Sequence, residues 1–373
     1  MLFKDVVGHE ELKKRLREEI KSGKVSHAQL FLGQLGHGSF ALALAYMQYL
    51  MCQNRQPEDS CGTCANCHKV AKAIHPDVHY VFPVVLKEGK TSDEFIDSWR
   101  ERLTGEPPYF SYSSWIYSIS TKARSGLISV HESVKLNQKL SLSSYEGGYK
   151  VVLIWKAEEM NVPFANKILK SLEEPSAKTV YILVAENGEN MLPTILSRCQ
   201  AKKVPRVSFA ETVAFLGREY GLNSEEAQSL TARYDANLTA ILENAEDSSS
   251  SDVHREDFIE LMRSSYKRNV IEMLKWCDKM GSNAKSRQSA FLLYSIHMFR
   301  QSILKNYTDD QLYRVSKEEA EFLKNFARFI NGNNIQDFTQ EFSQAHYNLE
   351  RNANPKIVFT ELCFQVMRFI HAA

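Results

Sequence analysis

The sequence lacks an excess of charge of either sign. Its 373 residues hold 46 lysines and arginines against 45 aspartates and glutamates, which leaves a formal net charge of +1. A protein that grips nucleic acid through its overall charge is usually strongly basic. The composition excludes that class, so any contact with DNA has to come from a local patch or from partner proteins.

Charged side chains are also missing from one long stretch. No aspartate, glutamate, lysine or arginine occurs between Val25 and Asn54, which is long enough to cross a bilayer. However, Gly33, Gly36 and Gly38 interrupt the stretch, and its first half is polar. We therefore expect a buried strand, a glycine loop and a buried helix here, and no membrane contact.

The N-terminal residues lack the basic segment and apolar run of a secretory signal, and the cysteine pattern lacks the regularity of a disulfide framework. Of seven cysteines, an odd number, four lie within residues 52–67, and Cys199, Cys277 and Cys363 are scattered. A reducing cytoplasm fits this pattern better than export. We expect a cytoplasmic protein.

Alternating strands and helices are predicted in the first half of the chain. Strands are expected at residues 28–32, 150–155 and 179–185, and helices at residues 5–22, 39–51, 128–140, 162–172 and around 192–196. Such alternation implies an α/β fold with a parallel sheet covered on both faces. Residues 83–125, rich in glycine, proline and aromatic residues, are predicted to be an irregular insertion. Its aromatic residues could form a partner surface, but we expect them to pack.

From about residue 206 onward only helical periodicity is found, and residues 246–252 form a polar, serine-rich linker. We therefore predict three domains. They are an α/β domain of residues 1–205, a small helical domain of residues 206–246 and a helical domain of residues 253–373.

The glycine loop departs from an ATPase motif at two positions. A phosphate-binding loop reads G-x-x-x-x-G-K-S/T, in which the lysine neutralises the terminal phosphates and the hydroxyl holds magnesium. Gly33 and Gly38 have the right spacing, and Gly36 lies between them. However, Ser39 stands where the lysine belongs and Phe40 where the hydroxyl belongs. We expect no ATP hydrolysis and at most weak nucleotide binding by the loop backbone; a turn without any ligand is the alternative.

A second expected element of an ATP site is also missing. In many such ATPases, a buried strand is followed by adjacent acidic residues, which hold magnesium and orient the attacking water. Here the strand of residues 150–155 ends in Trp155 and is followed by Lys156. Glu158 and Glu159 come later, where we expect a solvated or helix-capping role.

Four cysteines have the spacing of a metal site. Cys52, Cys61, Cys64 and Cys67 form the pattern C-x8-C-x2-C-x2-C. Four thiolates suit tetrahedral Zn2+ and leave no open position for water, so we predict a structural zinc site; a free or redox-active thiol cluster is the alternative.

Several short stretches together resemble the bacterial clamp-loader AAA+ ATPases. They are FKDVVGH at residues 3–9, HAQLFLG at 27–33, HPD at 75–77, NKILKSLEEP at 166–175, LPTILSRC at 192–199 and, more thinly, NANPK at 352–356. The most specific is the SRC motif formed by Ser197, Arg198 and Cys199. The resemblance covers most of residues 1–205 and implies a P-loop ATPase-like domain, a small lid domain and a C-terminal collar.

In that family, motor subunits carry intact ATP sites, whereas the delta-prime type has a degraded site and keeps the SRC arginine. The resemblance therefore implies that Arg198 acts in trans on ATP bound by a neighbouring subunit; a local ion pair is the alternative. It also implies partners: the gamma or tau motors and delta, through the collar and the Arg198 face, and the sliding clamp and primed DNA through the assembled complex. The insertion at residues 83–125 is longer than this family requires.

Two other functions remain open at this point. An ATP-binding motor subunit would need a cation at position 39 or carboxylates at positions 155 and 156, and the sequence has neither. A stand-alone zinc-containing DNA-binding protein would need a basic surface, which the near-neutral charge does not favour.

Overall fold

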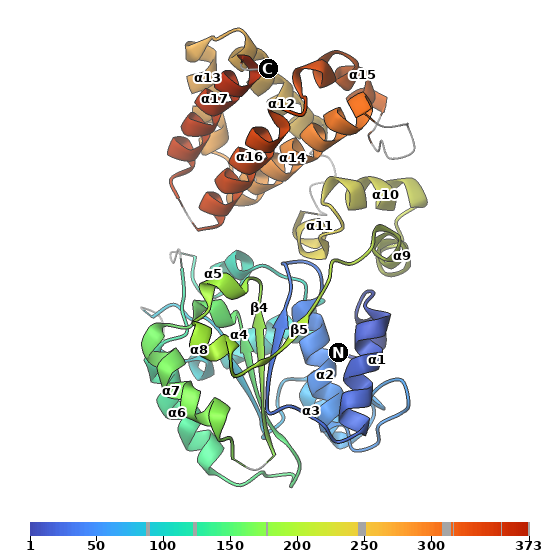
Figure 1. The fold of residues 1–373 in the computed structure, drawn as a ribbon, viewed down its shortest axis with the longest axis vertical. Coiled ribbons are helices and arrows are strands. Elements are labelled where there is room, and N and C mark those ends of the chain that lie inside the picture. Colours follow the sequence, from blue (N-terminus) through green and yellow to red (C-terminus); the bar gives the residue numbers. More distant parts are fainter. Residues whose placement is uncertain are drawn as a thin grey trace. The chain divides into compact units, whose positions relative to one another are not determined.

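The computed structural model describes residues 1–86, 90–121, 125–176, 178–244, 251–307, 315, 317–351 and 353–371. Contacts group the chain into two compact units, Met1–Glu211 and Thr212–Ala373 (Figure 1). Most of the predicted serine-rich linker, residues 246–250, lies outside the described residues. The prediction of three domains stays a prediction, because both predicted helical segments fall in the second unit.

A five-stranded parallel sheet forms the centre of the first unit. Its strands are β1 (Ala28–Leu32), β2 (Val78–Val81), β3 (Lys150–Trp155), β4 (Thr179–Ala185) and β5 (Gln200–Lys203). They lie in the order β2-β3-β4-β1-β5, and every neighbouring pair is parallel. The order places β4 between the strand before the glycine loop and the strand that ends in Trp155.

Helices cover both faces of this sheet. Successive side chains of a strand point to opposite faces, and all residues of β3 and β4 are buried, so both faces need a cover. The helices are α1 (Glu10–Lys21), α2 (Ser39–Met51), α3 (Ala65–Ala71), α4 (Ile96–Gly105), α5 (Tyr112–Ile119), α6 (Val130–Ser141), α7 (Val162–Glu173) and α8 (Pro193–Leu196), with short 3-10 helices at Phe3–Asp5, Ser92–Phe95, Ala157–Glu159 and Gly188–Asn190. Leu30 packs in a core with α6, α7 and α8. Phe31, the next residue, lies with its ring centroid 5.7 Å from that of Tyr46 on α2. Figure 1 shows α6 and α7 on one side of the sheet and α1 and α2 on the other.

The predicted α/β fold is confirmed, and the strands at residues 28–32, 150–155 and 179–185 have the predicted bounds. Two strands were missed: β2 is short, and β5 is a polar edge strand whose side chains are mostly exposed. The prediction that residues 83–125 are irregular is wrong, because the described part of this segment forms α4, α5 and a 3-10 helix. Buried aromatic residues hold these short helices against the sheet.

The second unit is helical throughout its described residues. After α9 (Phe209–Tyr220), which begins in the first unit, it contains α10 (Ser224–Arg233), α11 (Leu238–Asn244), α12 (Ser251–Tyr266), α13 (Val270–Gly281), α14 (Lys285–Tyr307), α15 (Lys317–Phe326), α16 (Ile335–Glu350), α17 (Pro355–His371) and a 3-10 helix at Ala327–Phe329. Trp276, Phe291 and Phe359 are fully buried in one continuous core that joins α12, α13, α14, α16 and α17. Among the described helices of the whole chain, none is long and apolar enough to cross a membrane.

Candidate functional site

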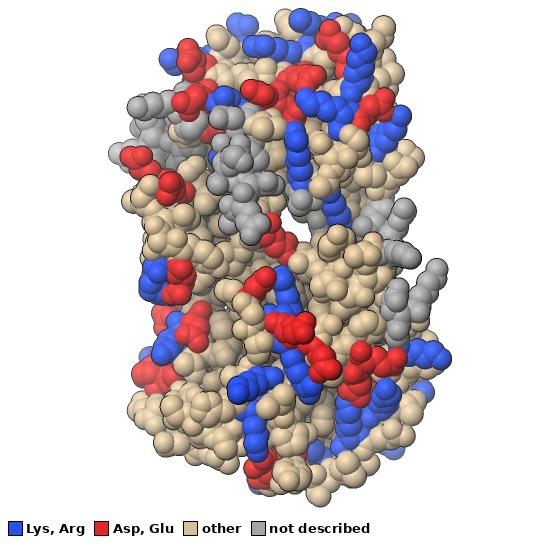
Figure 2. Space-filling view, turned by 180° about the vertical axis from the view of Figure 1, so that it is seen from behind, with Lys and Arg blue, Asp and Glu red and all other residues tan. Residues whose placement is uncertain are grey.

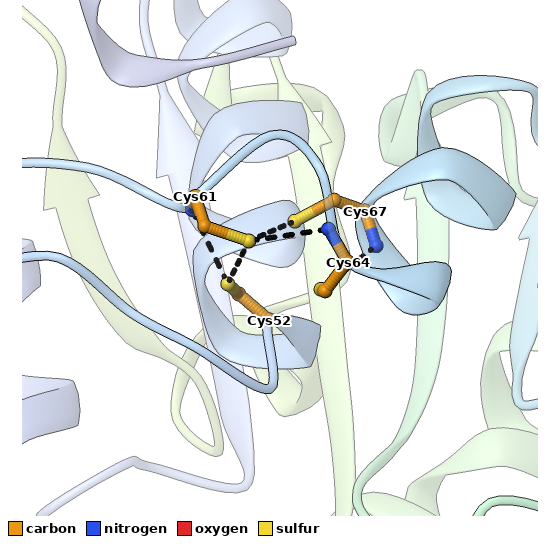
Figure 3. Close-up of side chains that lie close together, drawn as sticks. All are labelled: Cys52, Cys61, Cys64 and Cys67. Carbon is orange, nitrogen blue, oxygen red and sulfur yellow. Dashed lines mark hydrogen bonds between the residues drawn. The ribbon is translucent and has the colours of Figure 1, made fainter.

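The four clustered cysteines meet in the loop between α2 and α3. Cys52 caps the C-terminus of α2, and Cys64 caps the N-terminus of α3 by accepting the N–H of Cys67. The four sulfur atoms all lie within 4.8 Å of one another. Figure 3 shows the side chains of Cys52, Cys61 and Cys67 converging across the loop.

The spacing of the sulfurs fits a tetrahedral metal ion. Zn–S bonds of about 2.3 Å place two sulfurs of a tetrahedron about 3.8 Å apart. The Cys52 and Cys61 sulfurs are 3.6 Å apart, and those of Cys61 and Cys67 are 3.9 Å apart. The structure therefore brings together all four predicted ligands in a donor set that could hold one metal ion.

Backbone N–H groups point at these sulfurs. The N–H of Cys61 donates to the Cys52 sulfur at 3.4 Å, and the N–H of Cys64 donates to the Cys61 sulfur at 3.3 Å. Hydrogen bonds from backbone N–H groups, that of Thr63 first, lower the pKa of Cys61 to about 6. Such bonds favour the thiolate, which is the form that binds a metal.

The glycine loop contains two positions that require glycine. Gly38 has φ of +86°, in the left-handed region that glycine adopts without strain, and it caps α2. A Cβ atom on Gly33 would lie 2.8 Å from the carbonyl oxygen of Val204, so only glycine fits there. The first two residues of α2, Ser39 and Phe40, are both buried.

Aromatic rings meet at Phe40 and Trp155, two positions at which the sequence departs from the ATPase motifs. The ring centroid of Phe40 lies 5.7 Å from that of Trp155, at the end of β3. Two residues of the insertion join them: Trp99 and Phe110 each lie 5.8 Å from Phe40. All four side chains are at most 6% exposed. In an ATPase, the hydroxyl and carboxylate at these positions would hold magnesium, whereas these rings form an apolar cluster without a metal ligand.

The insertion also packs against the glycine loop itself. Tyr109 approaches to 3.6 Å from the point where a Cβ of Gly38 would lie, and its hydroxyl accepts the N–H of Val7 at 3.1 Å. The prediction that the aromatic residues of the insertion pack is confirmed for Tyr109, Phe110 and Trp115, which are buried, whereas Tyr117 is 67% exposed. Sequence reasoning missed the contact of the insertion with the loop, since no pattern links residues so far apart.

Lys156 is buried beside carboxylates. It forms ion pairs with Glu186 and, at 3.7 Å, with Glu158. Burial opposes the charge of Lys156, but these carboxylates outweigh burial and raise its pKa. The prediction of a solvated or capping role for Glu158 is wrong, because its side chain is 7% exposed and accepts the N–H of Glu186. Burial raises the pKa of Glu158 to about 7.

The three side chains of the SRC motif have different surroundings just after α8. The hydroxyl of Ser197 donates to the carbonyl oxygen of Thr194 at 3.2 Å, which braces the turn. Cys199 packs against the core under α6 and α7, and burial raises its pKa to about 11. Arg198 stays partly exposed and forms an ion pair with Glu173, at the end of α7. This pair is the local contact that sequence reasoning left open as the alternative for Arg198.

Comparisons with known proteins agree on one family. A family model described as DNA polymerase III, delta subunit, matches residues 8–208. The chain is 32% identical to the DNA polymerase III subunit delta' of Pseudomonas aeruginosa over 205 residues, which are 55% of this chain and 50% of that protein. Identity to the subunit delta' of Escherichia coli is 28% over 211 residues, 57% of this chain and 52% of that protein.

A relative named as another subunit of DNA polymerase III is also similar. The chain is 24% identical to the DNA polymerase III subunit tau of Bacillus subtilis over 216 residues, which are 58% of this chain and 31% of that protein. The chain spans about half the length of the delta' relatives it matches. The similarity covers mainly the first unit, which holds the glycine loop, the cysteine cluster and the SRC motif.

Proposed function

Because the chain belongs to the DNA polymerase III delta subunit family, we propose that it is a delta-prime-type subunit of a clamp loader, without ATPase activity of its own. The observation that carries this proposal is the aromatic cluster of Phe40 and Trp155 at the two degraded positions. An ATPase needs a hydroxyl and a carboxylate there to bind magnesium, and an apolar cluster binds neither the ion nor the phosphates.

Arg198 supplies the chemistry that this chain contributes in trans. A guanidinium is always charged and offers a planar fork of donors that matches two phosphate oxygens. The hydroxyl of Ser197 stabilises the turn that carries Arg198, and Cys199, the next residue, packs against the core. The backbone of Arg198 is therefore held firmly on both sides. In the assembled complex, Arg198 stabilises the charge that develops on the terminal phosphate of ATP bound to a gamma or tau neighbour.

The remaining partners follow from the same role. The helical second unit forms the collar that joins the motors and delta, and ATP binding by the motors opens the sliding clamp for loading on primed DNA. These are proteins that act on DNA inside the cell, so we place the chain in the cytoplasm. The cysteine cluster holds one structural Zn2+ through Cys52, Cys61, Cys64 and Cys67, which fixes the loop between α2 and α3.

Two other functions have less support. A motor subunit of the gamma or tau type needs the magnesium ligands that Phe40 and Trp155 replace. A stand-alone zinc-containing DNA-binding protein needs a basic surface. Figure 2 shows basic and acidic side chains interspersed over the face that it draws. Measurable affinity of the chain alone for DNA, decreasing with salt, would favour that second function.

The test compares ATP hydrolysis by the motor subunits of the same organism, assembled with this chain and stimulated by clamp and primed DNA. Arg198→Ala is expected to lower the stimulated rate about tenfold or more, because arginine fingers in other phosphate-transfer systems contribute roughly 10³–10⁵ in rate. Arg198→Lys is expected to restore little, because an ammonium group lacks the fork.

Two controls make the result specific. Arg15→Ala removes another arginine from the first unit, one that is 71% exposed, and is expected to leave the rate unchanged. The chain without motors is expected to hydrolyse no ATP. A normal rate in an assembled Arg198→Ala complex would reduce this chain to a scaffold, and hydrolysis by the chain alone would refute the interpretation of the glycine loop.

A further inference from the structure

The guanidinium of Arg198 is fully engaged within its own chain. Its Nε donates to Oε1 of Glu173 at 2.5 Å, and its Nη2 also pairs with Glu173. Its Nη1 donates to the carbonyl oxygen of Thr194 at 2.8 Å and to the hydroxyl of Ser197 at 3.4 Å. All three nitrogens therefore have partners, and the Nε–Nη2 edge faces a carboxylate.

These contacts are of two kinds. Thr194 and Ser197 belong to the turn that carries Arg198. Their hydrogen bonds to Nη1 are therefore local, and they fix the direction of the Arg198 side chain. Glu173 comes from another element, the last residue of α7, which ends there because Pro175 cannot continue the helix. By contrast, the ion pair between Arg15 and Glu11 joins two residues of the same helix, α1. Glu173 thus connects the arginine to a neighbouring helix.

The Arg198–Glu173 pair is open to exchange. The Arg198 side chain is 32% exposed and that of Glu173 is 46% exposed, so both are within reach of solvent and of a second protein. Partly exposed ion pairs are weak because water screens them. A carboxylate and a phosphate also compete for the same edge of a guanidinium, since both match its fork of donors.

We infer that Glu173 is a positioning residue for Arg198, which occupies the Nε–Nη2 edge of the guanidinium until the terminal phosphate of a neighbour's ATP displaces the carboxylate. This inference rests on the trans role proposed above. Glu173 neutralises the arginine while no phosphate is present, and it repels an incoming phosphate for as long as it stays beside the guanidinium. Thr194 and Ser197 keep Nη1 oriented during the exchange, so the arginine moves little and the carboxylate gives way.

The experiment uses the complete assembly of motors, delta and this chain. It measures ATP hydrolysis against ATP concentration, with and without clamp and primed DNA. Glu173→Gln keeps the size of the side chain and removes its charge. Glu174→Gln is the matched control. Glu174 is the next residue and is exposed, and its substitution changes the net charge by the same amount. Thermal unfolding of each variant checks that the fold persists, and Glu173→Ala provides a second removal of the carboxylate.

Glu173→Gln is expected to raise the basal rate of ATP hydrolysis and to lower the half-saturating ATP concentration. Each should change by about two- to fivefold, which is the effect expected from the loss of one partly exposed ion pair. The maximal stimulated rate is expected to stay within about twofold of wild type, since the carboxylate has already left by then. In the double variant with Arg198→Ala, the gain is expected to disappear. A merely structural pair would not produce this split between basal and stimulated rates.

Three results would overturn the inference. If Glu173→Gln and Glu174→Gln both match wild type, the pair does not restrain the arginine. If Glu173→Gln lowers the stimulated rate as Arg198→Ala does, the carboxylate is needed during hydrolysis. If Arg198→Ala has no effect, the proposed trans role fails and this inference fails with it; the first two results leave that role intact.

Discussion

At the scale of single residues, the positions at which the sequence departs from the ATPase motifs contact one another or their neighbours. Phe40 and Trp155 both pack against Trp99 and Phe110 of the insertion. Lys156 forms ion pairs with Glu158 and Glu186. Each replacement is therefore packed or paired with another. We therefore expect that a lysine restored at position 39 alone would not create an ATP site, because the aromatic cluster would stay in place.

Glu132 offers a residue-scale prediction on pH. It is buried on α6 and accepts the N–H of Ser92 at 2.7 Å, yet burial raises its pKa to about 7 from its usual 4.5. The folded chain then keeps a proton that the unfolded chain releases. This contribution to stability is fully present below about pH 4.5 and is lost as the pH rises through 7.

We expect Glu132→Gln to weaken the decrease in the free energy of unfolding between pH 5 and pH 8, measured with urea. Part of the decrease should remain, because burial raises the pKa of Glu158 to a similar value. Glu101→Gln, on the exposed side of α4, serves as the control and should match wild type. Equal decreases in wild type and Glu132→Gln would contradict the prediction.

At the scale of elements, the cysteine cluster ties three segments together. It joins the end of α2 to the start of α3, and the loop between them binds the N-terminus through Asp59. The carboxylate of Asp59 accepts the N–H groups of Phe3 and Lys4, both at 3.0 Å. An ion bound by the four thiolates would therefore stabilise the N-terminal segment as well as the loop.

Removal of one thiolate tests this element. We expect about one Zn2+ per chain in the wild type, and we expect Cys61→Ser to lose the metal and to unfold at a lower temperature, because metal binding contributes directly to folding. Cys199→Ser, outside the cluster, should keep its zinc. Metal analysis after dialysis and thermal unfolding measure both effects. A wild-type chain without metal, or a Cys61→Ser chain that retains it, would refute the zinc site.

At the scale of the whole molecule, each of the two units has its own buried core. The parallel sheet of Met1–Glu211 packs between two layers of helices, and the helices of Thr212–Ala373 enclose a core around Trp276. The four clustered cysteines, the glycine loop and the SRC residues all lie in the first unit. A change in the second core should therefore affect stability without changing these sites.

Trp276→Ala tests the independence of the cores. The side chain is fully buried, and its Nε1–H donates to the carbonyl oxygen of Asp257 at 3.0 Å. Its loss should destabilise the second unit by about 3–5 kcal/mol. Calorimetry should show one transition shifted to lower temperature, while the zinc content stays that of wild type. Trp276→Phe should have a smaller effect. Loss of zinc in Trp276→Ala would show that the units do not fold separately.

The sequence by itself determined the features that depend on local pattern. Continuous apolar runs set β1, β3 and β4, and motif spacing marked the four cysteines and the degraded glycine loop. The family followed from the same short motifs, which lie mostly in the first unit. The edge strand β5 was missed because three of its four residues are polar and it pairs on only one side.

Only the tertiary structure decided what fills the degraded site and what holds the arginine. Trp99 and Phe110 of the insertion reach Phe40 across more than 50 residues of chain, and Glu173 reaches Arg198 across 25. Periodicity reports which face of an element is buried, but it does not report its partners, because these depend on how the sheet and its helices pack. The sequence therefore showed where the chain departs from the ATPase motifs, and the fold showed which side chains pack at those positions.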